Sequence, residues 1–250
     1  MIIKAYSKVN LVLNIKGKRP DGYHEIETLM QSFEPHDDVE VNTASGKGIT
    51  LEISTKRLNT GNNLAIRAAE LMLEEFEKHC HVDIRIEKRI PVAAGLGGGS
   101  ADAAAVIAAL AKIWRINDMD KLMEIGARLG SDVPFCIASC FGRKAAIGRG
   151  RGEILEYVEP VNMQLEIKRL NYHIKDKTKT VYAELKPEDY EVQYDIDAFL
   201  KAPTLEEKDA LMGNHLQKPA FRVFAAAGYE LPAEPVHLSG AGPAVFRIVK

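Results

Sequence analysis

The chain has 250 residues, of which 46% are hydrophobic and 27% are charged, and its formal net charge is −2. This length is enough for one large domain or two smaller ones, each with its own core. The balanced charge argues against non-specific nucleic-acid binding, and no stretch reaches the roughly 20 apolar residues that cross a bilayer. Three cysteines and an N-terminus unlike a signal peptide favour reduced thiols and a cytoplasmic location.

The first half of the chain mixes strand and helix patterns. Alternating apolar residues predict strands in "KVNLVLNIKGKR", "DVEVNTASGKGITLEIST" and "HVDIRIEKRIPV", the last ending near Pro91, with a Pro-Asp-Gly turn between the first two. Helical spacing predicts a helix in "NNLAIRAAELMLEEFEKH", with Asn62 or Asn63 as its cap. Two more helices are expected, an alanine-rich one through about Trp114 and "DKLMEIGARLG", which stops at Gly130.

The second half has shorter elements. The patterns predict strands in "RGEILEYVE" and "MQLEIKRL", then short helices in "KTVYAEL", "APTLEEKDALMG" and "HLQKPAFRVFAAAG". The chain closes on "VHLSGAGPAVFRIV", a glycine-rich turn before a strand. Strands come early and no regular βαβ repeat is visible, so we expect an α+β protein with an N-terminal domain at 1–158 and a C-terminal domain at 159–250.

The segment "PVAAGLGGGSADAAA" joins clustered glycines to a strong helix former. Gly97, Gly98 and Gly99 let a ligand lie directly on the backbone, Ser100 occupies the expected N-cap, and the helix dipole favours an anion there. Asp102 in the first turn would repel a phosphate unless a cation intervenes. The segment is neither a Walker A loop nor a dinucleotide fingerprint. On these residues alone a tight strand-to-helix turn and a phosphate cradle remain equally open.

Three segments together resemble the signature segments of GHMP small-molecule kinases, in the same order over residues 4–135. They are "AYSKVNLVLNIKGKRPDGYHEIETLMQ", "PVAAGLGGGSADAAA" and "LGSDVPF". The resemblance implies a two-domain fold, with an N-terminal domain like ribosomal protein S5 domain 2 and a ferredoxin-like C-terminal domain. "KRPDGYHEIETLMQ" is similar to members that phosphorylate the tertiary 2-hydroxyl of a methylerythritol linked to cytidine diphosphate, with ATP as donor and Mg²⁺ as cofactor.

The resemblance also assigns the catalytic pair. Asp132 of "GSDVPF" is expected to polarise or orient the acceptor hydroxyl, and Lys8 of "YSKVN" to be the cation beside it. Read without the resemblance, Asp132 is more typical of a helix cap or turn, and Lys8 of a solvated strand lysine.

The same resemblance predicts the two binding sites. For the substrate, Tyr23 would stack on cytosine, His24 would contact its edge, and Asn10 would bind near the acceptor hydroxyl. Tyr182 would cover the other ring face, and Thr178 would be a polar contact nearby. For ATP, Asn63 and Lys88 are expected near the adenine and ribose, and the phosphates would lie on Gly95, Leu96, Gly97, Gly98, Gly99 and Ser100.

Simpler alternatives are open for some of these residues. Tyr23 and His24 would then pack a turn, and Lys88 would be an exposed strand residue. We expect no dedicated metal site of the protein itself, no nucleic-acid or membrane partner, and a monomer or weak homodimer. The basic "GRGRG" at 148–152 is expected to form a hairpin loop near the nucleotide rather than an RNA-binding repeat.

Several positions depart from the family pattern. Ala101 replaces a serine, "KDKTKTVY" lacks a usual Gly and Ser, "NHLQ" lacks two acids, and the chain stops soon after "SGAGP". Because of these departures, two other functions stay open as alternatives. One is a GHMP kinase for another small alcohol, such as homoserine, mevalonate or a sugar, and the other is a nucleotide-binding relative without turnover.

Overall fold

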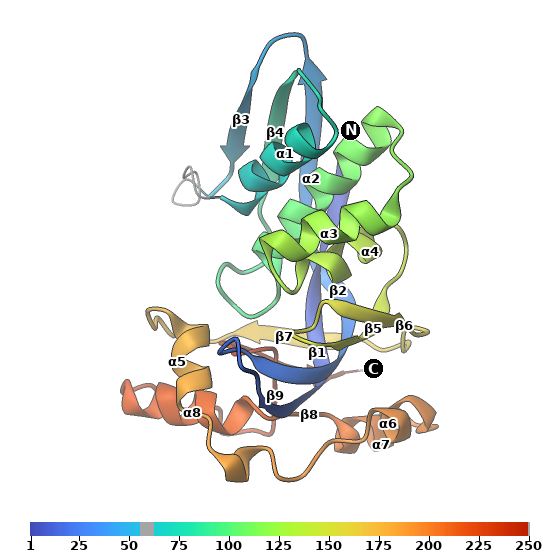
Figure 1. Ribbon diagram of the computed structural model, residues 1–250. Coiled ribbons are helices and arrows are strands. Elements are labelled where there is room, and N and C mark those ends of the chain that lie inside the picture. The colour runs from blue at the N-terminus through green and yellow to red at the C-terminus, as the bar shows by residue number, and fades with distance from the viewer. Residues whose placement is uncertain (56–62, 250) are drawn as a thin grey trace. The chain divides into compact units, whose positions relative to one another are not determined.

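The computed structural model describes residues 1–55 and 63–249 and divides into two compact units (Figure 1). The first unit contains residues Met1–Lys8, Ser32–Val92 and Gly97–Lys144. The second contains residues Val9–Gln31, Ala93–Leu96 and Ala145–Lys250. Because the units interleave along the chain, no single cut separates them. The domain boundary expected at 158/159 therefore stays a prediction.

Two long strands contribute to both units. β1 (Ile2–Lys18) begins in the first unit and continues in the second, and β2 (His24–Ala44) does the reverse. Side chains of β1 alternate between exposed and buried at its start, and they are buried without interruption from Ser7 to Ile15. Continuous burial indicates a strand that is covered on both faces, which explains why its apolar residues do not alternate cleanly.

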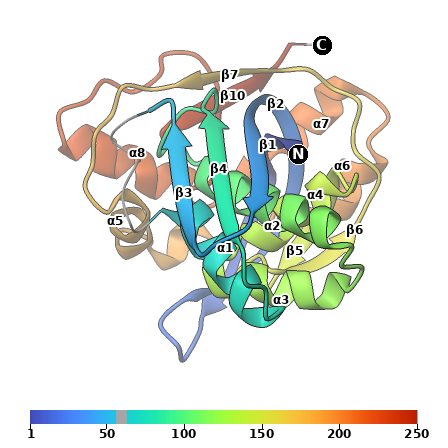
Figure 2. The same ribbon diagram turned by 90° about the horizontal axis from the view of Figure 1, so that it is seen from above.

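The first unit is a small sheet with helices. β3 (Gly48–Ile53) pairs in parallel with β4 (His81–Glu87), and β4 pairs antiparallel with the later part of β2, with Val41 opposite Ile84. The helices of this unit are α1 (Leu64–Glu75), α2 (Gly98–Trp114), α3 (Met119–Leu129) and α4 (Val133–Cys140). α1 packs against β3 and α2, and α2 also packs against α4 (Figure 2). Every residue of α2 from 101 to 111 is buried, which the many alanines permit.

Local signals account for the ends of these elements. The Asn63 side chain accepts from the backbone N–H of Ala65 and caps α1, and α3 has Gly130 as its C-cap, both as predicted. Asn62, the other cap expected for α1, lies outside the described residues. β4 ends at Glu87, before the expected end near Pro91. The difference has a cause: the N–H groups of Arg89 and Ile90 donate to Asp37 instead of continuing a sheet ladder.

The second unit contains one set of strands around β1 and β2 and a separate sheet. β5 (Ala145–Arg149) pairs antiparallel with the early part of β2 and with β6 (Ile154–Tyr157), and β8 (Gly213–Asn214) pairs in parallel with β1. β7 (Leu165–Arg169), β10 (Ala244–Ile248) and β9 (His237–Leu238) form a three-stranded sheet.

The helices of the second unit pack around its core. They are α5 (Lys177–Ala183), a 3₁₀ turn (Pro187–Asp189), α6 (Ile196–Lys201), α7 (Leu205–Leu211) and α8 (Gln217–Ala226). α5 packs on α8 and α6 packs on α7. The core brings together apolar residues from strands and helices, among them Leu13, Ile15, Val181, Leu216, Phe224, Leu238 and Val245.

The expected α+β class is confirmed, and the strands and helices predicted from 154 onward are present. The early part of β2, before Asp38, was not predicted, nor were α4, β5, α6, β8 and β9. The apolar run of α4 has no clear period, and β8 and β9 each have two residues, too few to show alternation. The S5-like and ferredoxin-like descriptions of the two domains stay predictions. Within 1–55 and 63–249, none of the helices has the length and apolar character that crossing a membrane requires.

Candidate active site

The glycine segment ends in a helix start that no side chain caps. α2 begins at Gly98, and Gly97 occupies the cap position with a left-handed backbone at φ 70°. The expectation that Ser100 is the N-cap is therefore wrong, because Ser100 lies within the first turn. Since glycine has no side chain, the first-turn N–H groups receive no capping bond from it, and such groups are a favourable place for an anion.

Two of the glycines are required by close approach and by backbone conformation. At Gly97, in the first unit, a Cβ atom would lie 2.9 Å from Cγ of Lys8. At Gly95, in the second unit, φ is 87° and a Cβ atom would overlap the carbonyl oxygen of Ser239. Both positions have the positive φ that disfavours any other residue. Leu96, between them, is buried.

Lys8 and Asp132 form an ion pair in the first unit. Nζ of Lys8 lies 3.2 Å from Oδ2 of Asp132, and the side chain of Lys8 is 5% exposed, against 36% for Asp132. Asp132 immediately precedes α4, but its side chain makes no capping bond to that helix. The interpretation of Lys8 as a solvated lysine is wrong, whereas Asp132 does lie in a turn at the cap position of α4, with its side chain bonded to Lys8 and not to the helix. The predicted pair is thus brought together, with its carboxylate partly open to solvent.

Lys88 is buried between two carboxylates. Its Nζ atom lies 2.5 Å from Oδ2 of Asp37 and 2.7 Å from Oδ2 of Asp102. Burial alone would lower the pKa of Lys88, but the two carboxylates outweigh it and raise that pKa. Burial raises the pKa of Asp102 to about 7, although Lys88 opposes the shift. Lys88 is therefore not an exposed strand residue, and its contact with the adenine or ribose stays a prediction.

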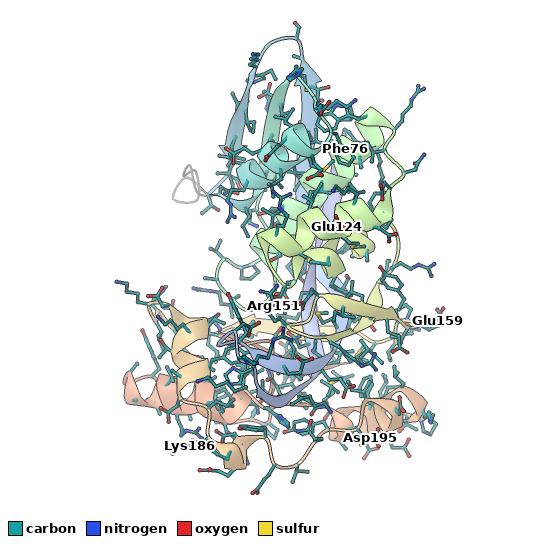
Figure 3. The ribbon with its side chains drawn as sticks, in the orientation of Figure 1. Phe76, Glu124, Arg151, Glu159, Lys186 and Asp195 are labelled. Atoms are coloured by element: carbon teal, nitrogen blue, oxygen red, sulfur yellow. The ribbon has the colours of Figure 1, made fainter. Side chains whose placement is uncertain are left out.

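Tyr23 lies on an exposed turn of the second unit with a cation over its ring. The Tyr23 side chain is 57% exposed, and the guanidinium carbon of Arg151 lies 5.1 Å from its ring centroid. Arg151, labelled in Figure 3, belongs to the turn between β5 and β6. The predicted "GRGRG" hairpin loop is therefore confirmed, whereas its proximity to the nucleotide stays a prediction.

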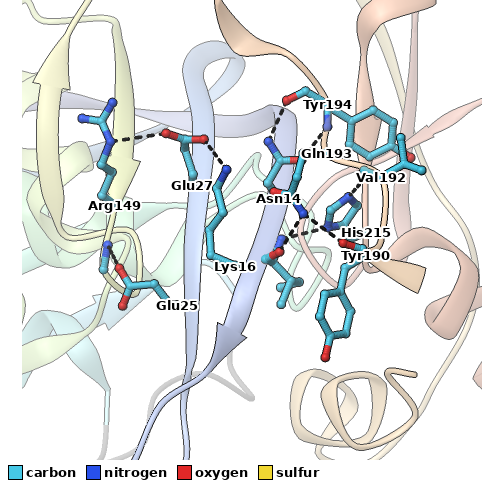
Figure 4. Close-up of polar contacts among 12 residues, drawn as sticks. Asn14, Lys16, Glu25, Glu27, Arg149, Tyr190, Val192, Gln193, Tyr194 and His215 are labelled. Atoms are coloured by element: carbon cyan, nitrogen blue, oxygen red, sulfur yellow. Dashed lines mark hydrogen bonds and ion pairs between the residues drawn. The ribbon is translucent and has the colours of Figure 1, made fainter. Parts of the chain in front are cut away.

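Acidic residues of β2 connect it to that hairpin. Glu25 accepts from the backbone N–H of Gly150, and Glu27 pairs with both Lys16 and Arg149, at 2.8 and 3.3 Å (Figure 4). A hydrogen bond from Lys16, helped by Arg149, outweighs burial and lowers the pKa of Glu27. The turn that holds Arg151 is thereby fixed to the strand that follows Tyr23.

His24 stacks on Tyr182. Their ring centroids lie 5.0 Å apart at an interplanar angle of 30°. Burial, assisted by the charge of Lys18, lowers the pKa of His24, so the ring is neutral at pH 7. Thr178, an exposed residue, precedes Tyr182 by one helical turn on α5 and shares its face.

Asn10 is buried on β1. Its Nδ2 atom donates to Oγ1 of Thr28 at 2.8 Å, and Thr28 in turn donates to the carbonyl of Val12. These bonds fix the orientation of the amide. Thr28 was not singled out from the sequence, and no strand was predicted over it.

The sequence also missed two residues that hold the "SGAGP" turn. Asn214 donates to the carbonyls of Leu238 and Gly240, both at 2.8 Å, and the Ser239 hydroxyl donates to the carbonyl of Gly95 at 3.1 Å. "NHLQ" and "SGAGP" were noted as departures from a pattern, with no role assigned. The Ser-Gly-x-Gly-Pro turn signal was the available clue, since such turns need side-chain partners.

The glycine-bounded helix start and the ion pair between the buried Lys8 and the partly exposed Asp132 both lie in segments that resemble those of GHMP kinases. Residues 63–140 match the family model "GHMP kinases N terminal domain". A crystal structure of mevalonate kinase matches with a TM-score of 0.67 over 100% of this chain and 91% of that one, at 17% identity, a likeness of fold alone.

Proteins with a higher sequence identity to this chain define its family more specifically. The 4-diphosphocytidyl-2-C-methyl-D-erythritol kinase of Syntrophomonas wolfei is 40% identical over 261 residues, covering 99% of this chain and 89% of the relative. That of Pelotomaculum thermopropionicum is 38% identical, covering 97% and 86%. A crystal structure of 4-(cytidine 5'-diphospho)-2C-methyl-D-erythritol kinase matches with a TM-score of 0.81 at 35% identity, covering 98% and 89%. The chain belongs to the 4-diphosphocytidyl-2-C-methyl-D-erythritol kinase family.

Proposed function

We propose that this chain transfers the γ-phosphoryl group of ATP to the 2-hydroxyl of 4-diphosphocytidyl-2-C-methyl-D-erythritol, a step of non-mevalonate isoprenoid synthesis. The reaction breaks the bond between the γ-phosphorus and the bridging oxygen and forms one to the hydroxyl oxygen, releasing ADP and a proton. The observation that carries the proposal is the Lys8–Asp132 pair, at 3.2 Å, in a chain of this kinase family.

The pair suits a poorly acidic tertiary hydroxyl. Phosphoryl transfer passes through a loose transition state, so orientation and charge stabilisation matter more than covalent chemistry. Asp132 would accept the hydroxyl's hydrogen bond and direct its oxygen at the phosphorus. Lys8 would stabilise the charge that develops on the transferring group. The partial exposure of Asp132 leaves one side of its carboxylate open to a ligand.

The start of α2 is proposed to bind the triphosphate. Its first-turn N–H groups lack a capping side chain, and the helix dipole favours negative charge there. The described residues hold no cluster of three or more His, Cys, Asp or Glu suited to a metal. A Mg²⁺ ion would be held mainly by the phosphate oxygens, and the hydroxyl of Ser100, in the first turn of α2, would be the protein oxygen donor at that helix start. The ion would neutralise phosphate charge.

The nucleoside of the substrate is assigned to residues of the second unit. Tyr23 offers an exposed ring for stacking, and the His24–Tyr182 pair offers a second aromatic surface with a neutral ring nitrogen. Asn10 is the proposed contact near the acceptor hydroxyl, and Thr178 a polar contact beside Tyr182. Each of these roles is supported by where the residue lies and by its place in the family's motifs.

Further properties are proposed with the function. A cytoplasmic location is supported by Cys80, Cys136 and Cys140, all of which are free thiols. We also propose a monomer or weak homodimer that binds no nucleic acid and no membrane. Among the rivals, a kinase for another alcohol is disfavoured by the family of the chain. The other rival, a nucleotide-binding protein without kinase activity, is disfavoured by the intact Lys8–Asp132 pair.

One assay separates these functions. Purified protein is given Mg·ATP with 4-diphosphocytidyl-2-C-methyl-D-erythritol, and ADP release is compared with that on homoserine and mevalonate. We expect turnover with the cytidine-linked alcohol and none above background with the other two. Turnover on a control alcohol alone would replace the substrate, and ATP binding without turnover on any alcohol would favour the non-catalytic relative.

A further inference from the structure

Three charged residues of the first unit form a closed network beneath the start of α2. Lys88 lies just after β4, Asp37 lies on β2, and Asp102 lies in the first two turns of α2. Nζ of Lys88 bridges the two carboxylates at 2.5 and 2.7 Å, and the three side chains are at most 5% exposed. A charge cluster buried this deeply persists only when its members satisfy one another, so these residues hold their elements together.

The network is not itself an anion site. It contains two carboxylates and one ammonium, and the second oxygen of Asp102, Oδ1, is buried without a hydrogen-bond partner. An ammonium already shared by two carboxylates has little attraction left for a phosphate. A role in which Lys88 neutralises nucleotide charge is therefore a poor fit to this geometry, and a mechanical role is a better one.

The bonds of the network converge on the segments at the two sides of the glycine loop. Oδ1 of Asp37 accepts from the backbone N–H groups of Arg89 and Ile90, at 2.5 and 2.8 Å, and so fixes the chain that leaves β4. Asp102 anchors the other side. Between them lies Gly98, where a Cβ atom would sit 3.4 Å from Nζ of Lys88 and 3.1 Å from Cγ2 of Ile90.

We propose that Asp37, Lys88 and Asp102 are positioning residues for ATP. They hold residues 88–90 against the first turns of α2 and thereby fix the direction of the backbone N–H groups from Gly98 to Ser100. The inference rests on the proposed binding of the nucleotide phosphates at this helix start. None of the three needs to touch the nucleotide, since each acts through the backbone that it fixes.

The decisive variant is Lys88→Met. It removes the shared cation that bridges Asp37 and Asp102, so the contact that holds residues 88–90 against α2 is lost. We expect the KM for ATP to rise by about tenfold or more, because a buried charge left without its partner is strongly unfavourable. The KM for the cytidine-linked substrate should stay within about twofold, because its proposed contacts lie in the other unit.

Conservative variants distinguish positioning from mere stability. Asp102→Asn keeps the shape and the bond to Lys88 and leaves the remaining pair neutral, so its KM for ATP should change by less than about threefold. The double variant Lys88→Met/Asp102→Asn removes the uncompensated carboxylate and should recover part of the lost ATP affinity. Lys121→Met is the matched control, since it breaks an ion pair between α3 and Glu75 of α1 in the same unit.

Three quantities are measured for each variant. They are the steady-state KM and kcat for each substrate, the affinity for Mg·ADP by calorimetric titration, and the melting temperature. A selective rise in KM for ATP with partial rescue supports the proposal. An unchanged KM for ATP in folded Lys88→Met protein overturns it, as does an equal rise in both KM values or the absence of rescue. If Lys88→Met does not fold, Asp37→Ala replaces it, because this variant removes the acceptor for the N–H groups of Arg89 and Ile90 and leaves Lys88 paired with Asp102. A selective rise in its KM for ATP would support the proposal, and an unchanged KM for ATP would overturn it.

The titration with Mg·ADP keeps this inference separate from the proposed function. If wild-type protein binds Mg·ADP but turns over no cytidine-linked alcohol, the proposed substrate is wrong, and the variants still test the network through nucleotide affinity alone. If the wild type turns over that alcohol and the network variants bind nucleotide normally, the network proposal is wrong and the function stands.

Discussion

Lys8 on β1 and Asp132 at the start of α4 meet as a pair in the first unit, 3.2 Å apart, with the lysine buried and the aspartate half open. The carboxylate of Asp132 is more exposed than the ammonium of Lys8, which indicates a role beyond stability. An ion pair that only stabilises the fold gains nothing when its carboxylate is open to solvent. An aspartate at a helix start would ordinarily bond to the first-turn N–H groups, and Asp132 does not. Its carboxylate is held by Lys8 instead.

Asp132→Asn tests the catalytic assignment. The amide keeps the size of the carboxylate but cannot accept a proton, so we expect kcat to fall by about 10³-fold, within the range lost when a transition-state interaction is removed. The melting temperature should fall only moderately, because the buried ammonium of Lys8 loses a charged partner that is itself partly exposed and keeps the amide oxygen as an acceptor. The measurement is kcat from ADP release with saturating substrates. Near-normal kcat in folded protein would remove Asp132 from the mechanism.

Gly97→Ala tests the close packing of the glycine loop. The added methyl would meet Cγ of Lys8 at 2.9 Å on a backbone at φ 70°, so we expect a loss of about 1–3 kcal/mol in the free energy of unfolding. Gly99→Ala is the matched control, because its methyl would meet only Leu64 Cδ1, at an ordinary 3.7 Å. Chemical denaturation of both variants measures the difference. Equal stabilities would contradict the packing argument.

Tyr23→Ala tests the nucleoside site. Stacking on an aromatic ring contributes about 1–3 kcal/mol per base, so we expect the KM for the cytidine-linked substrate to rise by about tenfold or more with the KM for ATP unchanged. Tyr23→Phe keeps the ring and should stay close to wild type. Arg151→Met should give a smaller rise, about threefold, because its guanidinium supports one face of the ring. A rise in the KM for ATP alone would move Tyr23 to the other ligand.

His215 predicts an acid-dependent loss of stability. Its Nδ1 accepts from the N–H of Ile15 and its Nε2 donates to the carbonyl of Val192, a neutral arrangement visible in Figure 4. Burial lowers the pKa of His215, so the unfolded chain binds more protons than the folded one below about pH 6.5. The stability gained from the neutral ring is present above that pH and is lost as the pH falls.

Thermal unfolding measured between about pH 5 and 8 checks this sign, since the unperturbed histidine pKa lies inside that window. We expect the midpoint of the wild type to fall toward low pH, and His215→Gln to show a shallower slope from a lower starting stability. His79→Gln, at an exposed histidine, is the control and should keep the wild-type slope. An unchanged slope in His215→Gln would contradict the assignment.

Much of the site was predictable because its residues sit in short local motifs. Lys8, Asp132, the glycines and Tyr23 lie in segments whose order and spacing carry the information, and the periodicities of α1, α2 and α3 are strong. Ser100 was misplaced because sequence preferences for caps rank serine highly, whereas the helix begins one turn earlier at a left-handed glycine.

The network of Asp37, Lys88 and Asp102 could not be predicted from local sequence motifs. Asp37 lies in "HDDVE", where nothing distinguishes it from the neighbouring Asp38, and its partners are far away in the sequence. Only the folded chain shows that one of these two aspartates is fully buried and accepts two backbone N–H groups. The contact between Arg151 and Tyr23 could not be predicted from the sequence either, because nothing in the two segments indicates that they lie together in the fold.

The interleaving of the chain limits how such a kinase can change. The chain passes from one unit to the other at residues 8/9, 31/32, 92/93, 96/97 and 144/145, so neither unit is a continuous segment. Gene fusion or recombination moves continuous segments of a chain. No continuous segment of this chain contains one whole unit and nothing else. The residues proposed for phosphoryl transfer and those proposed for the nucleoside are therefore inherited together. No exchange of one continuous segment would replace a whole unit, so point substitutions are the more direct way to change the alcohol specificity of this chain.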